Sequence, residues 1–284
     1  MKIRKPYVAN AFYAGTKTEL TKQIVSCFTH RFGPGQVPKV VERGGPRKIL
    51  GLVSPHAGYA YSGPVAANGY SHLAADGIPE VFVILGPNHT GYGSGVSILT
   101  DGAWETPVGI TSVDSGLAKQ IQKASNILDI DEASHSSEHS IEVQLPFIQF
   151  LFKDGPKFIP ICMMMQDLQT SRDMAKSIVE QCKGKNFIII ASSDFTHYET
   201  QDSAVRKDKM AIDAITNLDD ATLNALGDTN RVTMCGYGPI TTLIAAAKML
   251  GGIKAELLAY KTSGDITGDK SSVVGYSSIL FSRE

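Results

Sequence analysis

The stretch that decides the fold is Val81-Phe82-Val83-Ile84-Leu85, followed by Gly86-Pro87-Asn88-His89. An unbroken apolar run rich in β-branched residues and closed by Gly-Pro predicts a strand buried on both faces, in the middle of a parallel sheet. His89 then stands just beyond the carboxyl end of that strand. Because ligands of open α/β sheets bind along this edge, His89 is a candidate functional residue.

The same pattern occurs twice more in the chain. Ile49-Leu50-Gly51-Leu52-Val53 runs into Ser54-Pro55-His56, and Phe187-Ile188-Ile189-Ile190-Ala191 runs into Ser192-Ser193-Asp194-Phe195-Thr196-His197. If the three strands are neighbours, His56, His89 and His197 converge on one pocket. Helical spacing of apolar residues between the strands indicates βαβ units. We therefore predict one α/β domain over residues 1–284, with a central, mostly parallel sheet flanked by helices.

Composition narrows the function classes. The 284 residues are 43% hydrophobic, and 27 Lys and Arg balance 28 Asp and Glu for a net charge of −1. Such a balance attracts neither nucleic acid nor an anionic membrane. No run approaches the roughly 20 apolar residues of a membrane span. The four cysteines are scattered without a C-x-x-C pair, which indicates reduced thiols in a cytoplasmic protein.

Histidines at three equivalent strand ends point to a metal, because neutral imidazole suits zinc, copper and ferrous iron. Asp194 precedes His197 in the same turn, where it could be a ligand, a general base or the carboxylate that fixes a histidine tautomer. Cys235 lies in a glycine-flanked loop before a predicted helix, whose amino terminus would favour thiolate. It is a candidate metal ligand or nucleophile.

The segment His135-Ser136-Ser137-Glu138-His139 matches the H-x-x-E-H pattern of a class of zinc peptidases. Residues 134–152 have the apolar spacing of an amphipathic helix, in which Pro146 predicts a kink. Three serines mark the start of a helix rather than its interior, so metal-dependent hydrolysis is the weaker reading. The turn Gly91-Tyr92-Gly93-Ser94-Gly95 is not the dinucleotide fingerprint, and we expect no nucleotide cofactor.

Five motifs in order resemble the Memo family, the protein B-like component of AmmeMemoRadiSam systems. They are Ser54-Pro55-His56-Ala57-Gly58-Tyr59, Leu85-Gly86-Pro87-Asn88-His89, Glu138-His139-Ser140-Ile141-Glu142-Val143-Gln144-Leu145-Pro146-Phe147, Ser192-Ser193-Asp194-Phe195-Thr196-His197 and Cys235-Gly236-Tyr237-Gly238-Pro239. The segment Ala9-Asn10-Ala11-Phe12-Tyr13-Ala14-Gly15 departs from the family's more usual Ala-Gly-x-Phe-Tyr-Pro at the expected rim of the pocket.

The resemblance implies a fold similar to the catalytic subunits of type III extradiol ring-cleaving dioxygenases, in which two histidines and a glutamate bind non-haem iron. By this likeness His56, His89 and Cys235 are the expected metal ligands. His197 is the expected acid or base, with Asp194 and His139 beside it in the pocket. A thiolate in place of glutamate suits copper or zinc as well as iron, so ring cleavage does not follow from the fold.

Two functions remain open from the sequence. The first is metal-dependent redox or oxygenase-like chemistry with iron or copper on a small substrate. The second is a binding protein that uses the same pocket for a metal or a phosphorylated peptide, as the resemblance to eukaryotic Memo proteins implies. AMMECR-type and radical SAM proteins are the partners that the family association suggests.

Overall fold

Four parallel strands form the centre of the main sheet in the computed structural model, which describes residues 2–42, 47–153 and 155–284. Their order is β2-β9-β3-β8, and they span Ile49–Ser54, Phe187–Ser192, Val81–Pro87 and Lys157–Met163. The three strands that share the apolar pattern are therefore direct neighbours. Their carboxyl ends meet at one edge, as the pattern predicts.

Further strands extend this centre into a mixed sheet of nine strands among the described residues, and all of the added pairs are antiparallel except β4 with β7. On the β2 side lie β12, β11 and β10, at Val273–Arg283, Ile253–Thr262 and His197–Glu199. On the β8 side lie β4 and β7, at Val96–Ile98 and Asp129–Ile130. A separate small sheet joins β1, β5 and β6, at Ile3–Arg4, Ala103–Thr106 and Gly109–Ser112.

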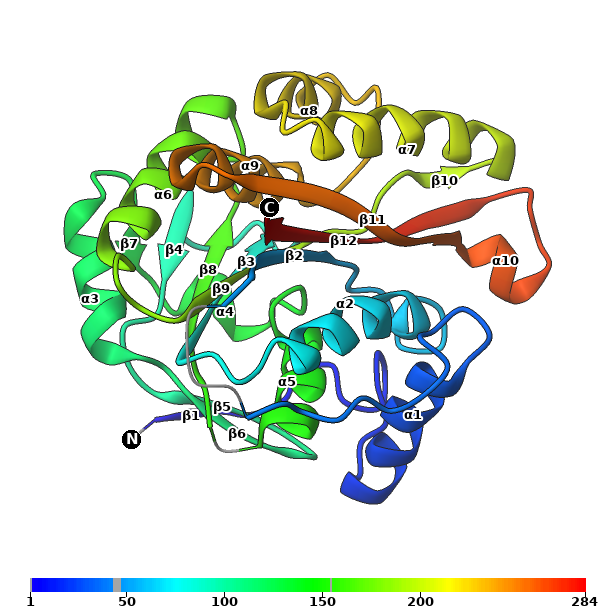
Figure 1. The fold of residues 1–284 in the computed structure, drawn as a ribbon, viewed down its shortest axis with the longest axis horizontal. Coiled ribbons are helices and arrows are strands. Elements are labelled where there is room, and N and C mark those ends of the chain that lie inside the picture. The colour runs from blue at the N-terminus through cyan, green and yellow to red at the C-terminus, as the bar shows by residue number, and fades with distance from the viewer. Residues whose placement is uncertain (1, 43–46, 154) are drawn as a thin grey trace.

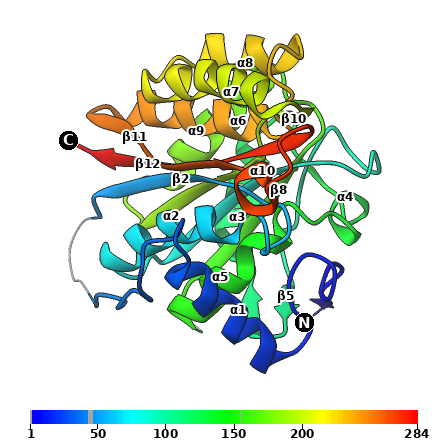
Figure 2. The same cartoon turned by 90° about the vertical axis from the view of Figure 1, so that its right-hand side faces the viewer.

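Helices cover both faces of the main sheet (Figures 1 and 2). One face carries α1, α2 and α5, at Lys17–Thr29, Gly63–Ala75 and Leu145–Phe152. The other carries α6, α7, α8 and α9, at Leu168–Gln181, Gln201–Thr216, Asp220–Asp228 and Tyr237–Leu250. Shorter or more peripheral helices are α3, α4, η1 and α10, at Ser115–Ala124, Ala133–Ser136, Glu142–Gln144 and Ser263–Thr267.

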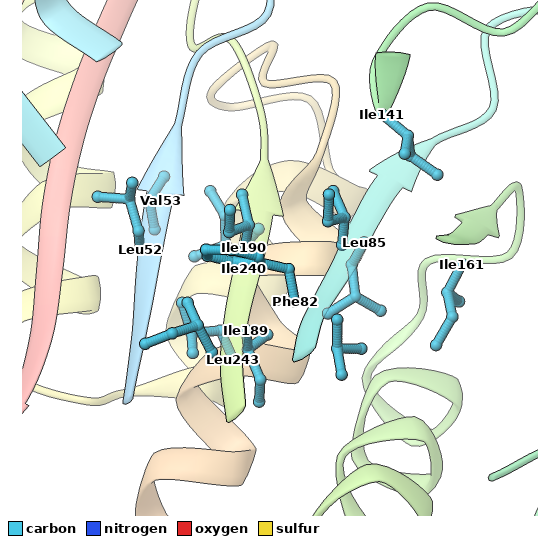
Figure 3. Close-up of a cluster of buried hydrophobic side chains, with 14 of the residues drawn as sticks. Leu52, Val53, Phe82, Leu85, Ile141, Ile161, Ile189, Ile190, Ile240 and Leu243 are labelled. Atoms are coloured by element: carbon cyan, nitrogen blue, oxygen red, sulfur yellow. The ribbon is translucent and has the colours of Figure 1, made fainter. Parts of the chain in front are cut away.

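The core lies on both faces of the central strands. Figure 3 shows part of it, with Ile189 and Ile190 of β9 among side chains of the neighbouring strands and with Ile240 and Leu243 of α9 in the same cluster. All four of these residues are fully buried. Burying an aliphatic side chain of this size stabilises the folded state by about 1.5–3 kcal/mol. The rigid centre of the sheet therefore supports the polar turns at its carboxyl edge.

The predicted amphipathic helix over residues 134–152 is wrong as one element. The chain forms α4, then leaves the helical conformation over residues 137–141, and resumes through η1 into α5. Pro146 is the second residue of α5, where its missing N–H removes no hydrogen bond, so it starts a helix instead of kinking one. His135 and His139 consequently do not share a helix face.

Across the described ranges of the chain, no helix is both long and apolar enough to cross a membrane.

Candidate functional site

One cavity of about 530 Å³ at the carboxyl edge of the sheet gathers all the candidate residues. The turns after β2 and β3 supply His56 and His89, and the turn after β9 supplies Asp194. The remaining candidates on its wall are His139, His197 and Cys235. The structure therefore brings together the six residues expected as metal ligands or as acid and base, and it leaves out His135 of the H-x-x-E-H pattern.

Three histidines form the tightest donor cluster of this cavity. One ring nitrogen from each of His56, His89 and His139 lies within 4.8 Å of the other two. The ring centroids of His56 are 5.2 Å from those of His89 and 5.4 Å from those of His139, and the latter two are 4.6 Å apart. The sequence placed His139 only beside the ligands, whereas the geometry makes it a candidate ligand.

Hydrogen bonds fix the protonation of the His56 ring. Ser192 Oγ has one proton, which it donates to the carbonyl of Ser140 at 2.7 Å. It also lies 2.8 Å from His56 Nδ1, so the ring nitrogen must be the donor in that contact. Gln144 Nε2 donates to the same hydroxyl oxygen at 2.9 Å. His56 Nε2 therefore keeps its lone pair.

Glu138 plays the same part for His89. Its Oε1 lies 2.9 Å from His89 Nδ1, and its Oε2 accepts the backbone N–H of His89 at 2.5 Å. Burial opposes the charge of Glu138, but the hydrogen bond from His89 and the nearby imidazoles lower its pKa to about 2. An ionised carboxylate at Nδ1 keeps the proton on that nitrogen, so Nε2 has the lone pair that can bind a metal. The carboxylate also raises the basicity of Nε2, as in carboxylate–histidine pairs behind metal ions.

Two of the three imidazoles, those of His56 and His139, are kept neutral by their surroundings. Burial lowers the pKa of His139 to about 4, and it lowers the pKa of His56 well below the ordinary value, with the neighbouring imidazoles adding to the effect. Phe12 packs on His139 with ring centroids 4.6 Å apart and forms part of the cavity wall. Neutral imidazoles present lone pairs, which a metal requires.

Cys235 touches the cluster from one side. Its Sγ lies 3.2 Å from His56 Nε2 and accepts the backbone N–H of Asp194 at 3.3 Å. Although the side chain is partly accessible from the cavity, the surrounding protein desolvates it, and the charge of Asp194 adds to this; both raise the pKa of the thiol. The expected thiolate at the start of α9 is therefore not favoured here, because desolvation outweighs the helix dipole.

His197 and Asp194 differ in what their polar atoms do. His197 Nδ1 donates to the carbonyl of Thr233 at 2.8 Å, so its Nε2 is unprotonated when the ring is neutral. Asp194 Oδ1 accepts the backbone N–H of His56 at 2.9 Å, and burial raises the pKa of Asp194 to about 6. His197 is thus free to accept a proton, while Asp194 holds the turn that carries His56.

His135 lies outside the cavity. Its Nε2 is 3.2 Å from Ser97 Oγ, and its ring meets that of Trp104 edge to face at 5.9 Å. Burial lowers the pKa of His135 to about 4. The two histidines of H-x-x-E-H therefore have separate environments, and the pair that a helical zinc motif needs is not formed.

Sequence reasoning missed the residues that orient the rings. In the sequence, Glu138 stood out only as a member of the H-x-x-E-H pattern and of a family-like motif, and Ser192 only as part of a turn motif. The position of Glu138, directly before His139 in the H-x-x-E-H pattern, was the feature that could have pointed to a role in the pocket. Nothing in the local pattern pointed to the contact between Ser192 and His56, because it joins residues 136 positions apart.

Comparison with known proteins matches nearly the whole chain to one family. The sequence model of one family, described as Memo-like protein, matches residues 4–280. A MEMO1 family protein of Methanopyrus kandleri is 48% identical over 282 residues, covering 99% of both chains. One of Pyrobaculum aerophilum is 50% identical over 287 residues and covers both chains completely. A crystal structure of an uncharacterized protein from Escherichia coli K12 shares the fold, with a TM-score of 0.57 and 12% identity over 82% of this chain and 100% of that one.

Proposed function

This chain belongs to the Memo family, and on that premise we propose that its histidine pocket is a transition-metal centre for redox chemistry on a small molecule. The observation that carries the proposal is the convergence of three imidazole nitrogens within 4.8 Å of one another. The Nδ1 atoms of His56 and His89 are hydrogen-bonded to Ser192 and Glu138, which leaves the Nε2 lone pair of each ring for a metal. Prearranged neutral imidazoles fit iron, copper or zinc.

His56 and His89 are the ligands common to every donor set that the pocket offers. His139 completes the set by proximity, and Cys235 completes the set that the family resemblance implies. The thiol of Cys235 lies against His56 Nε2, the same lone pair that a metal would take. A metal ion on His56 Nε2 therefore cannot coexist with the present contact between the protonated thiol and this nitrogen. On binding, the ion would displace either the proton of the Cys235 thiol or the whole thiol group.

Iron or copper bound there would supply electron transfer and open coordination positions for a small reactant. The chain itself supplies the rest. Asp194 holds the backbone of His56, and Glu138 holds the ring of His89. The Nε2 of His197 would accept a proton from a hydroxyl of the small molecule, because its Nδ1 proton is held by Thr233. A cavity of about 530 Å³ suits a molecule of modest size.

The alternative of a phosphorylated peptide in this pocket is less well supported. Recognition of a phosphate requires cationic donors, usually arginine. The imidazoles of His56 and His139 have lowered pKa values and are neutral at neutral pH. An anionic side chain would therefore gain little attraction from them.

The experiment that tests the function is oxygen uptake. Protein loaded with iron(II) or copper would be screened against catechols and other oxidisable small molecules, with His56→Ala and His197→Gln alongside the wild type. We expect the first variant to lose both metal and turnover, and the second to keep the metal but lose turnover. Tight metal binding without turnover of any organic substrate would contradict the redox proposal and favour metal handling.

A further inference from the structure

Glu138, which orients His89, and the pocket residue His139 lie on a segment with no helix or strand of its own. Residues 137–141 connect α4 to η1, and they include both Glu138 and His139. Backbone carbonyls of such a segment need donors from elsewhere in the protein, since no ladder or helix supplies them. The position of the pocket's acid and its third imidazole thus depends on what holds this segment.

Arg4 of β1 supplies donors to this segment and to its flanks, in addition to the bond from Ser192 to the carbonyl of Ser140. Its Nε donates to the carbonyl of His135 at 2.7 Å, and its Nη2 donates to the carbonyl of Glu138 at 2.9 Å. Its Nη1 donates to the carboxylate of Glu142 at 2.5 Å. The guanidinium also lies over the ring of Trp104, 4.1 Å from its centroid. One rigid planar group therefore holds the segment at Glu138 and holds its two flanks at His135 and Glu142.

Glu142 extends the same connection to the opposite wall of the pocket. Its fully buried carboxylate accepts the backbone N–H groups of Tyr7 at 2.9 Å and Val8 at 3.0 Å, and the hydroxyl of Tyr13 at 2.6 Å. These contacts hold the chain on both sides of Phe12, whose ring packs against His139. Arg4 and Glu142 thereby join the amino-terminal segment and the histidine-bearing segment into one unit.

We propose that Arg4 is a positioning residue of the pocket, setting Glu138 and His139, and through Glu138 the ring of His89, without itself lining the cavity. This inference rests on the proposed metal centre for its effect on affinity. A lysine cannot replace Arg4, because a single ammonium on a flexible stem does not hold three acceptors in one fixed arrangement. The sequence gives no sign of this role, since the contact with Glu138 spans 134 positions.

Arg47 provides a matched control elsewhere in the protein. Its guanidinium is similarly buried, lies 3.3 Å from the carboxylate of Asp76, and donates to the carbonyls of Gly77 at 2.5 Å and Leu73 at 3.5 Å. It therefore makes the same kinds of bond as Arg4, but to residues outside the cavity. Its replacement should reproduce the cost of losing a buried arginine and nothing more.

The test compares Arg4→Gln, Arg4→Lys and Arg47→Gln with the wild type by two measurements. The first is the dissociation constant of iron(II) or copper. The second is the set of ¹⁵N chemical shifts of the His89 and His139 rings in metal-free protein, which report tautomer and hydrogen bonding. We expect Arg4→Gln to weaken metal binding by about tenfold or more, the range typical of residues that orient ligands. Arg4→Lys should fall between that variant and the wild type.

Arg4→Gln should also shift both sets of ring signals, whereas Arg47→Gln should change neither the ring signals nor the affinity. Equal losses in Arg4→Gln and Arg47→Gln, or ring signals that stay unchanged in Arg4→Gln, would overturn the inference. If the wild type binds no metal, the proposed function fails, and the ring signals alone still decide the role of Arg4. Arg4→Lys keeps the test informative if Arg4→Gln does not fold.

Discussion

His135 and His139 lie four residues apart in one motif, yet the protein uses them in unlike ways. His139 stands with His56 and His89 at a cavity, whereas His135 packs against Trp104 and Ser97 on the other side of the segment. Burial lowers the pKa of both to about 4. A perturbed histidine is therefore not enough to identify a site, and what separates the two is the chemistry of their neighbours.

The difference has a local cause in the chain. The helix that would place residues four apart on one face ends after Ser136. Glu138 then folds its carboxylate back to accept the backbone N–H groups of His139 and Ser140, each at 2.8 Å. Those bonds compete with helical hydrogen bonding, and they turn the two histidines to opposite sides.

The largest predicted effect concerns His135 and acid stability. Its pKa of about 4 in the folded protein lies below the ordinary 6.5, so between these values the unfolded chain binds a proton that the native protein does not. Stability is complete above pH 6.5 and falls as the pH drops to 4, by up to about 3 kcal/mol from this residue. Urea unfolding of His135→Gln between pH 4 and 7 should therefore show a weaker dependence on pH than the wild type.

His72 is the control for that measurement, because it is exposed on α2. His72→Gln should leave the dependence on pH as it is in the wild type. Equal slopes for the wild type and His135→Gln would show that His135 is not held neutral by its surroundings.

The next prediction concerns Glu138, which lies beside His139, and its effect on metal affinity. Glu138→Gln keeps the size of the side chain but removes the charge that holds His89 Nδ1. We expect the affinity for iron(II) or copper to fall about 10- to 100-fold. Glu132→Gln is the matched control, since Glu132 pairs with Lys2 at the surface, and its loss should leave the affinity unchanged. Unaltered affinity in Glu138→Gln would separate Glu138 from the metal site.

The smallest effect concerns the orientation of His56. Ser192→Ala removes the acceptor for His56 Nδ1 while leaving the ring itself in place. The variant loses three hydrogen bonds of the hydroxyl, of which the one with His56 bears directly on the metal. A neutral hydrogen bond is worth about 1 kcal/mol, which corresponds to about fivefold weaker metal affinity. Calorimetric titration of the metal-free protein would measure it. Ser97→Ala, which removes the partner of His135, should not change the affinity at all.

Much of the fold was readable because the apolar runs are continuous and their turns are marked. The three histidine-bearing strands and their adjacency follow from patterns that burial on both faces imposes. The predicted helix over 134–152 failed because its apolar spacing continued past a segment whose backbone is held by Glu138. Local spacing does not report where a side chain bonds back to the chain.

The sequence predicted which residues form the site but not the role of each residue. Residue type placed His56, His89 and His197 at one edge, since the strands that carry them are adjacent. The state of Cys235 could not be read, because desolvation by the folded protein decides it. Arg4 and Ser192 act through contacts between distant parts of the chain, which only the assembled structure shows.

The measurement that tests the central claim most directly is an equilibrium titration of iron(II) or copper into metal-free wild type, His139→Ala, His135→Ala and Cys235→Ser. The account predicts one ion per chain in the wild type, loss of at least tenfold in affinity in His139→Ala, and wild-type binding in His135→Ala. A similar loss in Cys235→Ser would add the thiol to the ligand set. Binding that His135→Ala weakens as much as His139→Ala, or no binding in the wild type, would contradict the three-histidine centre.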